Sequence, residues 1–252
     1  MTRPGPSRGS RPPAPPDSLW LYGLHAVRAA LANPGRTVLE AVATRNAAQE
    51  LGLAEPAVRL VDPRELSRLL PPEAVHQGAA IRVRPLPDAE LDTLASPATP
   101  GAPLVVLDQV TDPHNVGAIL RSAAAFGALG LVMTTRNAPR ESGVLAKAAS
   151  GALEAVPIAR VVNLARALDT LKDSGWRVIG LEGGAPAALP AFVDGDPLAL
   201  VFGAEGAGLR ELTRKTCDSL ARLPTRGSLA SLNVSNAVAV ALYVAGGGSA
   251  GD

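Results

Sequence analysis

The sequence predicts an α/β protein built on a mostly parallel sheet with helices on both faces. From Pro103 onward, short apolar runs typical of buried strands alternate with longer segments whose apolar residues recur at helical spacing. The chain has 252 residues, 47% of them hydrophobic, which is enough to bury a large core. Strand–helix alternation of this kind is typical of parallel sheets, which bind ligands beyond the carboxyl ends of their strands.

The first 17 residues differ in composition from everything that follows. They hold six Pro, three Arg and one Asp, with no periodic apolar pattern. Such a composition cannot bury enough apolar surface to offset the entropy lost on ordering. We expect residues 1–17 to be a disordered tail.

Residues 18–90 predict a compact α/β domain of their own. Its first helix ends at Asn33-Pro34-Gly35, and a second begins at Asp62-Pro63, where Asp caps the helix and Pro occupies the first turn. The expected strands are Thr37–Ala43, Ala57–Val61 and Ala79–Val83. The stretch from Asp88 to Pro100 is rich in Pro and small residues and has few apolar side chains that could anchor it. We therefore take residues 91–101 as a linker.

Residues 102–247 predict the parallel-sheet domain. Its expected strands are Leu104–Leu107, Leu131–Thr134, Ala155–Ala159, Val178–Leu181 and Leu198–Phe202. Its expected helices are Pro113–Phe126, Glu141–Ala149, Leu164–Lys172, Leu209–Lys215 and Val234–Val244. The last helix is apolar on nearly all sides, which predicts that it is buried.

The first of three polar clusters follows the strand at 104–107. Asp112-Pro113 starts a helix in which Arg121 points away from the apolar stripe, over a surface of small residues. Such a place suits an anionic ligand, but this stretch alone favours an ordinary surface Arg on a solvated helix.

The second cluster, Gly203-Ala204-Glu205-Gly206-Ala207-Gly208, follows the strand at 198–202. Glycines let a backbone approach a ligand closely and leave its N–H groups accessible. The spacing is neither the dinucleotide fingerprint nor a Walker loop, which argues against a nicotinamide dehydrogenase and a P-loop NTPase. A simple tight turn remains an alternative.

The third cluster runs from Leu223 to Asn236 into the last predicted helix. Ser231, Asn233 and Ser235 can each cap that helix. The number of polar side chains exceeds what one cap needs, which suggests a polar site at the helix N-terminus.

Composition excludes several other classes of protein. Net charge is +1, and residues 18–90 carry eight basic and eight acidic side chains, so any RNA contact must come from local patches. The three His are far apart and predict no metal site, and the single Cys217 fits a reducing cytoplasm. No apolar run reaches the ~18 residues of a membrane span, and no leader pattern opens the sequence, so we expect a cytoplasmic protein without a membrane segment.

Taken together and in order, the three clusters resemble a known family. The segments 112–122, 202–209 and 223–235 are similar to the three motifs of the SpoU/TrmH family of RNA ribose 2′-O-methyltransferases, in the knotted SPOUT superfamily. Tyr22-Gly23-Leu24-His25 and His76-Gln77-Gly78 are similar to the start and end of the L30e/L7Ae-like substrate-binding domain found in the bacterial branch that methylates a guanosine of 23S rRNA. Departures are small: Leu223, Thr225 and Asn236 stand where the family often has Ile, Met and Val.

The resemblance implies a fold, a cofactor and a set of site residues. It implies a C-terminal trefoil knot that binds S-adenosylmethionine, a homodimer with the knot at its interface, and 23S rRNA as the partner. By matching to the family motifs, the implied cofactor-binding residues are Gly203, Leu223 and Leu232. The implied catalytic residues are Asn115, Arg121, Glu205, Ser231 and Asn233.

Three other functions remain open at the level of the sequence. The first keeps the chemistry but acts on tRNA, although the L30e-like resemblance argues against it. The second is an RNA-binding homologue without catalysis, which the intact set of polar motif residues argues against. A dinucleotide oxidoreductase is the most distant, because the glycine spacing does not fit it.

Overall fold

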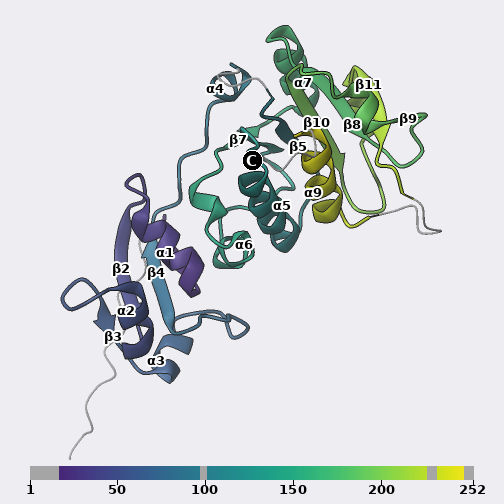
Figure 1. Cartoon of the computed structure of the whole chain (residues 1–252). Coiled ribbons are helices and arrows are strands. Elements are labelled where there is room, and N and C mark those ends of the chain that lie inside the picture. Colours follow the sequence, from purple (N-terminus) through teal and green to yellow (C-terminus); the bar gives the residue numbers. More distant parts are fainter. Residues whose placement is uncertain (1–16, 97–100, 226–231, 247–252) are drawn as a thin grey trace, which may run out of the picture.

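The computed structural model describes residues 17–96, 101–225 and 232–246, which form two sheets (Figure 1). The expectation of a disordered tail falls almost wholly outside these residues. The first sheet has the order β1-β4-β2-β3 and belongs to what we call the N-terminal unit. Its strands are β1 (Leu19–Tyr22), β2 (Val38–Ala43), β3 (Arg59–Leu60) and β4 (Ala79–Val83). Its helices are α1 (Leu24–Ala32), α2 (Arg45–Leu51) and α3 (Pro63–Ser67).

The second sheet confirms the predicted parallel α/β architecture. Its seven strands have the order β7-β6-β5-β10-β8-β11-β9, and every adjacent pair is parallel. We call this sheet and its helices the C-terminal unit. The strands are β5 (Leu104–Asp108), β6 (Gly130–Thr134), β7 (Ile158–Val161), β8 (Arg177–Leu181), β9 (Ala187–Ala188), β10 (Leu198–Gly203) and β11 (Ser219–Arg222).

Helices cover both faces of this sheet. On one face lie α5 (Pro113–Ala125), α6 (Gly143–Ala149), the 3-10 helix η1 (Ala152–Glu154) and α9 (Val234–Ala245). On the other lie α4 (Leu91–Ala95) and α7 (Leu164–Asp173), with α8 (Glu211–Thr216) packed against α7, and a second 3-10 helix η2 (Leu189–Phe192) follows β9. Successive side chains of β5 enter opposite cores, because a strand points alternate residues to opposite faces.

The cap residues read from the sequence begin the two helices that matter most for the site. The Asp112 side chain accepts a hydrogen bond from the backbone N–H of His114 and starts α5, with Pro113 in its first turn. Of the three candidate caps for the last helix, Asn233 accepts from the N–H of Ser235 and starts α9. Both helices therefore begin directly at a polar cluster.

Some predicted boundaries were wrong. The strand expected at Ala155–Ala159 begins later, at Ile158, because the preceding residues form η1 and its exit. The helix expected from Glu141 begins at Gly143, since Ser142 caps it and Glu141 turns its side chain elsewhere. The short strands β1, β9 and β11 were not predicted, because two to four residues give too little periodicity to recognise.

The expected linker is more ordered than its composition suggested. Leu94 and Ala95 of α4 are buried against the core on the α7 side of the sheet. Trp176 donates its indole N–H to the carbonyl oxygen of Ala95 at 2.7 Å, and both atoms are buried. The stretch has few anchoring apolar side chains, as expected, but one Leu at the right position suffices to dock a single turn.

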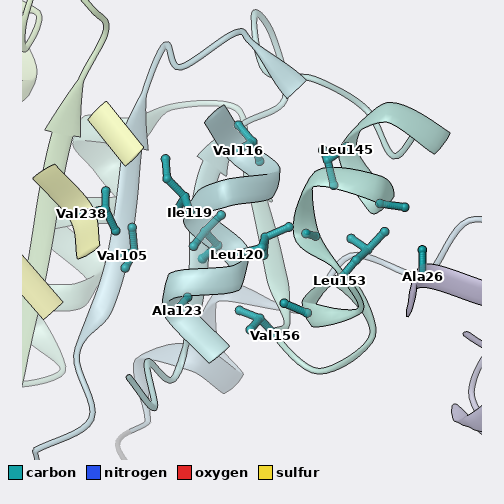
Figure 2. Close-up of a cluster of buried hydrophobic side chains, with 14 of the residues drawn as sticks. Ala26, Val105, Val116, Ile119, Leu120, Ala123, Leu145, Leu153, Val156 and Val238 are labelled. Carbon is teal, nitrogen blue, oxygen red and sulfur yellow. The ribbon is translucent and has the colours of Figure 1, made fainter. Parts of the chain in front are cut away.

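One hydrophobic core runs without interruption from the C-terminal sheet to the N-terminal unit. Figure 2 shows α5 in the middle of it, with Val105 and Val238 on one side and Leu145 and Leu153 on the other. Ala26 of α1 belongs to the same cluster, which continues into the N-terminal unit as far as Ala47 and Ile81. The two units are therefore packed against each other through α6 and η1.

Helix α9 is only half buried, which corrects the expectation of an all-round buried helix. Val234, Val238, Ala241 and Leu242 are buried, whereas Val240 and Tyr243 are 41% and 53% exposed. Tyr243 makes an edge-to-face ring contact with Phe126, the exposed C-cap of α5, at 6.2 Å between centroids. The outer side of this helix pair is thus an apolar surface.

Candidate active site

A cavity of about 390 Å³ opens where three adjacent strands of the C-terminal sheet end. It is lined by the segments that follow β8, β10 and β11, together with the start of α9. All three residues implied as cofactor-binding, Gly203, Leu223 and Leu232, line it. This is the edge at which parallel sheets bind ligands, and the size suits a small organic molecule.

Gly203 permits the close turn that forms one wall of this cavity. A Cβ added there would lie 2.1 Å from the backbone carbon of Gly208, so no larger residue fits without moving the loop. Gly206 and Gly208 have φ of 76° and 68°, in the left-handed region that glycine adopts without strain. A Cβ at Gly184, Gly206 or Gly208 would meet nothing within 4 Å, so backbone at these three positions stands open to a ligand.

A buried carboxylate anchors the far end of the Gly203–Gly208 loop. Asp108, fully buried at the end of β5, accepts from the backbone N–H of Arg210 at 3.1 Å and from its Nε at 2.6 Å. A buried charge of this kind is stabilised only when its oxygens are paired. The pair ties the loop after β10 to the strand that leads into the first polar cluster.

Side chains from all three clusters meet beside the cavity. Asn233 donates from Nδ2 to Glu205 Oε1 at 2.5 Å and lies 3.1 Å from Asn115 Oδ1. Asn115 donates from its own Nδ2 to the same Glu205 oxygen at 3.2 Å. Asn115 is 90 residues from Glu205 and 118 from Asn233, so only the fold brings the three together. Their amide donors surround a carboxylate at the mouth of the cavity, which can orient a polar substrate group.

The structure does not bring Arg121 to this cluster. Arg121 is exposed and makes no hydrogen bond or ion pair with any residue that the structure describes. Six residues separate it from Asn115 along α5, which amounts to about 9 Å of rise and about 120° of rotation. Arg121 thus faces away from Asn115, on the side of the helix free of this chain's core. Ser231 lies outside the described residues.

Sequence reasoning missed one side of the cavity. Glu182, Gly183 and Gly184, directly after β8, line it opposite the glycine loop. The Glu182 carboxylate accepts from Arg214 Nε at 2.9 Å, which fixes its position. A signal was present, because these residues follow a predicted strand at the same sheet edge as the two recognised loops.

Other chemistries find little support in the described parts of the chain. Within them, no group of three or more His, Cys, Asp or Glu residues could hold a metal ion. Burial raises the pKa of Cys217 to about 12, so its thiol stays protonated at neutral pH and is no nucleophile. Among the helices of residues 17–96, 101–225 and 232–246, none is long and apolar enough to cross a membrane.

Two family profiles match nearly the whole chain. The profile described as "SpoU rRNA Methylase family" matches residues 102–243, which include the cavity and the Asn115–Glu205–Asn233 cluster. The profile described as "RNA 2'-O ribose methyltransferase substrate binding" matches residues 20–89, the N-terminal unit.

Individual relatives agree with these profiles. A Burkholderia protein named 23S rRNA (guanosine-2'-O-)-methyltransferase RlmB is 42% identical, over 89% of this chain and 94% of its own. An uncharacterized tRNA/rRNA methyltransferase of Synechocystis is 46% identical over 68% of this chain, which spans only 45% of that longer protein. An AdoMet-bound rRNA methyltransferase from Sinorhizobium meliloti has the same fold, with a TM-score of 0.76 and 25% identity, over 91% of this chain and 87% of that one.

Proposed function

The chain belongs to the SpoU rRNA methylase family, and we propose that it transfers a methyl group from S-adenosylmethionine to the ribose 2′-oxygen of a guanosine in 23S rRNA. The observation that carries this proposal is the meeting of Asn115, Glu205 and Asn233, from three separate motifs, at the mouth of the Gly203 cavity. The substrate is inferred from the name of the Burkholderia relative, which matches this chain along nearly its full length.

The residues around the cavity fit S-adenosylmethionine. Apolar side chains of Leu181, Leu223 and Leu232 offer contacts to a flat base, and the glycines of two loops offer backbone groups at close range. The carboxylate of Glu205, which is bound by the neutral amides of Asn115 and Asn233, lies at the same cavity, where it favours a cationic ligand. When bound there, the cofactor supplies an activated methyl group on a sulfonium.

Positioning is the main contribution expected of this chain, because methyl transfer needs the 2′-oxygen in line with the methyl group. In the proposed mechanism Asn115 and Asn233 orient the ribose, and Glu205 holds both amides in place. Ser231 is assigned to the same site from the family motif alone.

Arg121 is assigned to the phosphate and to the developing alkoxide. A guanidinium keeps its proton in proteins, so it is a poor base but a strong donor to anionic oxygens. The proton of the 2′-hydroxyl then passes to a substrate phosphate or to water.

A homodimer resolves the separation of Arg121 from Asn115. The exposed apolar surface formed by Phe126, Val240 and Tyr243 lies on α5 and α9, the helices that carry Arg121 and Asn233. A second copy of the chain that covers this surface would bring its own Arg121 toward the active site of the first copy.

We also propose a role for each unit of the chain and a more detailed fold for the C-terminal unit. We assign residues 18–90 to an L30e/L7Ae-like RNA-binding domain and residues 102–247 to the catalytic domain, joined by 91–101. A trefoil knot in the C-terminal part is assigned from the resemblance to the family motifs. The cytoplasm is the expected location, because rRNA is made and modified there in bacteria.

The test is methyl transfer by the purified protein. S-adenosylmethionine labelled in its methyl group is incubated with 23S rRNA or tRNA, and nucleosides are separated after digestion. We expect label in 2′-O-methylguanosine from 23S rRNA, and a rate at least about 100-fold lower for Arg121→Lys, which loses the planar fork. Label in tRNA alone would mean that the substrate is tRNA and not 23S rRNA. No label in either RNA would overturn the proposal.

A further inference from the structure

An ion cluster joins the two units, and its centre is the most deeply buried guanidinium of the described residues. The Arg36 side chain has 0% exposure, against 11% for Glu141 and 7% for Glu154. Arg36 belongs to the N-terminal unit, whereas Glu141 and Glu154 flank α6 in the C-terminal unit. We call these three residues the Arg36 clamp.

The clamp satisfies nearly all of the guanidinium's donors. Arg36 forms a two-point fork with Glu154, from Nη2 to Oε1 at 2.6 Å and from Nε to Oε2 at 3.1 Å. Its Nη1 donates to Glu141 Oε1 at 2.6 Å and to the carbonyl oxygen of Arg84 at 2.9 Å. A planar fork engaged by two carboxylates in different directions fixes an angle as well as a distance.

Local structure on both sides holds the clamp in place. In the turn at Asn33-Pro34-Gly35, Asn33 donates from Nδ2 to Glu154 Oε2 at 2.7 Å, and its carbonyl oxygen accepts from the N–H of Arg36. On the other side, Glu141 Oε2 accepts from the backbone N–H of Leu86 at 2.9 Å. The Arg36 side and the Glu141 side of the clamp are therefore both held by hydrogen bonds to neighbouring groups, in addition to the ion pairs.

The interface next to the clamp is close-packed and allows little adjustment. A Cβ at Gly143 would lie 2.3 Å from Tyr22 Cε1 and 2.6 Å from the carbonyl oxygen of Trp20. Lys147, one helical turn further along α6, donates to Gln77 Oε1. Helix α6 thus touches β1 and the His76-Gln77-Gly78 turn on one side.

On its other side, α6 packs against the helix that carries the active site. A Cβ at Gly117 of α5 would lie 2.5 Å from Ala148 Cβ and 2.6 Å from the carbonyl oxygen of Leu145. Gly117 is two residues from Asn115. Contacts therefore run from Arg36 through Glu141 and α6 to α5. Figure 2 shows the last of these steps, with Leu145 of α6 beside α5.

The clamp is better suited to setting an orientation than to adding stability. Burial raises the pKa of Glu141 despite the opposing effects of Leu86 N–H and Arg36, so its desolvation outweighs the attraction to its partners. Buried ion pairs often contribute no more stability than an apolar contact of the same shape, yet removing one partner leaves an uncompensated charge. Such a pair therefore favours one relative orientation of the two units over slightly different orientations.

We propose that Arg36 is a positioning residue, which through Glu141 and Glu154 fixes the N-terminal unit at one angle to the catalytic site. RNA held by the N-terminal unit then reaches the Asn115–Glu205–Asn233 cluster in one geometry. The consequence for RNA rests on the proposed function, but the fixed angle does not.

The angle is tested by single-molecule energy transfer between dyes at Asn46→Cys on α2 and Arg166→Cys on α7, both exposed positions. Cys217 is left in place, because its raised pKa keeps it unreactive toward maleimide at neutral pH. Labelled chains are mixed with excess unlabelled protein so that each assembly carries one dye pair. We expect one narrow distribution for the parent protein and a broad or shifted one after Arg36→Gln.

The matched control is Arg177→Gln, which removes an Arg bound to Asp194 and Asp196 inside the C-terminal unit alone. It should leave the distribution as in the parent. If Arg36→Gln does not fold, Glu141→Gln carries the test, since it keeps the Arg36–Glu154 fork. An unchanged distribution in a folded clamp variant would overturn the proposal.

The effect on RNA is read from the same variants. We expect Arg36→Gln to raise KM for 23S rRNA about tenfold or more, with the Kd for S-adenosylmethionine within twofold of the parent value. Parallel loss of cofactor affinity would mean general damage and contradict a positioning role. A parent protein that methylates no RNA but shows the narrow distribution would overturn the proposed function and leave the fixed angle standing.

Discussion

Asn233 performs two tasks that a substitution can separate. Its Oδ1 caps α9 by accepting from the N–H and the hydroxyl of Ser235, while its Nδ2 donates to Glu205. Ser is as good a helix cap as Asn but has no amide donor. The cap and the active-site contact therefore make different demands on this position.

Asn233→Ser should reduce the rate of methyl transfer by about 10- to 100-fold, because Glu205 loses one of its two amide donors. The free energy of unfolding should change by less than about 0.5 kcal/mol, since the cap is kept. Urea unfolding and single-turnover kinetics measure the two effects. Asn233→Ala serves as the comparison, with the same loss of rate and a further loss of about 1 kcal/mol. A normal rate for Asn233→Ser would refute the orienting role.

At the scale of single residues, the sequence predicted the candidate site residues better than the ion pairs that join the two units. The three motifs singled out Asn115, Glu205 and Asn233 because their order and spacing match a family, and the three side chains do meet. Their catalytic roles stay predictions. Arg36 was not identified, although the Asn33-Pro34-Gly35 turn was, because nothing in a lone Arg after a turn indicates a carboxylate more than 100 residues away. Pairing across such separations depends on tertiary packing that local patterns do not encode.

Helix α9 is the element whose surroundings differ most from the prediction. Its composition is apolar on all sides, which alone cannot distinguish burial in one chain from burial between two chains. The structure divides the helix into an inner face with Val238 and Leu242 and an outer face with Val240 and Tyr243. The outer face is where we expect the second subunit.

Val240→Glu should weaken the proposed dimer, because it would bury a charge at the apolar interface that we infer on the outer face of α9. A cost of about 2–3 kcal/mol corresponds to roughly 30- to 150-fold in the dissociation constant. Sedimentation equilibrium measures it directly. The control is Val162→Glu, at a position that is 90% exposed on the loop after β7 and should leave the dimer intact. Equal behaviour of the two variants would place the dimer interface elsewhere.

Among the elements, long strands and capped helices were predicted best. β5, β6, β8 and β10 combine apolar runs with turn residues at both ends, so their existence and type were clear from the sequence. α4 was missed because a single turn shows no period, and its position depends on Leu94 finding a pocket beside α7. The strands β9 and β11 were missed because they are also too short to show a period.

For the whole molecule, the Arg36 clamp links stability to pH. The pKa of Glu141 is raised above 4.5, so this carboxyl binds its proton more tightly in the folded than in the unfolded state. Its contribution to the free energy of unfolding therefore falls as pH rises from about 4 through the raised pKa. Gln at this position has no such dependence.

Urea unfolding of the parent protein and of Glu141→Gln, measured from pH 4 to pH 7, tests this sign. The stability of the variant relative to the parent should increase across that range, because only the parent incurs the growing cost of the buried carboxylate. A relative stability that is constant or decreases would mean that Arg36 compensates the charge of Glu141 fully.

The architecture as a whole was predictable to the level of the parallel sheet and no further. Alternation of strands and helices gives the class, but the position of β10 between β5 and β8 depends on crossovers that periodicity does not specify. The same holds for the packing of the N-terminal unit on α6, which no composition shift along the chain indicated.

A comparison of cells with and without the gene for this chain decides whether it methylates a ribose of 23S rRNA, as proposed. Ribose methylation is mapped at nucleotide resolution on 23S rRNA and on tRNA from both. We expect one guanosine of 23S rRNA to lose its 2′-O-methyl group without the gene and to regain it with the parent gene but not with Asn115→Ala. An unchanged methylation map of 23S rRNA would rule out 23S rRNA as the substrate.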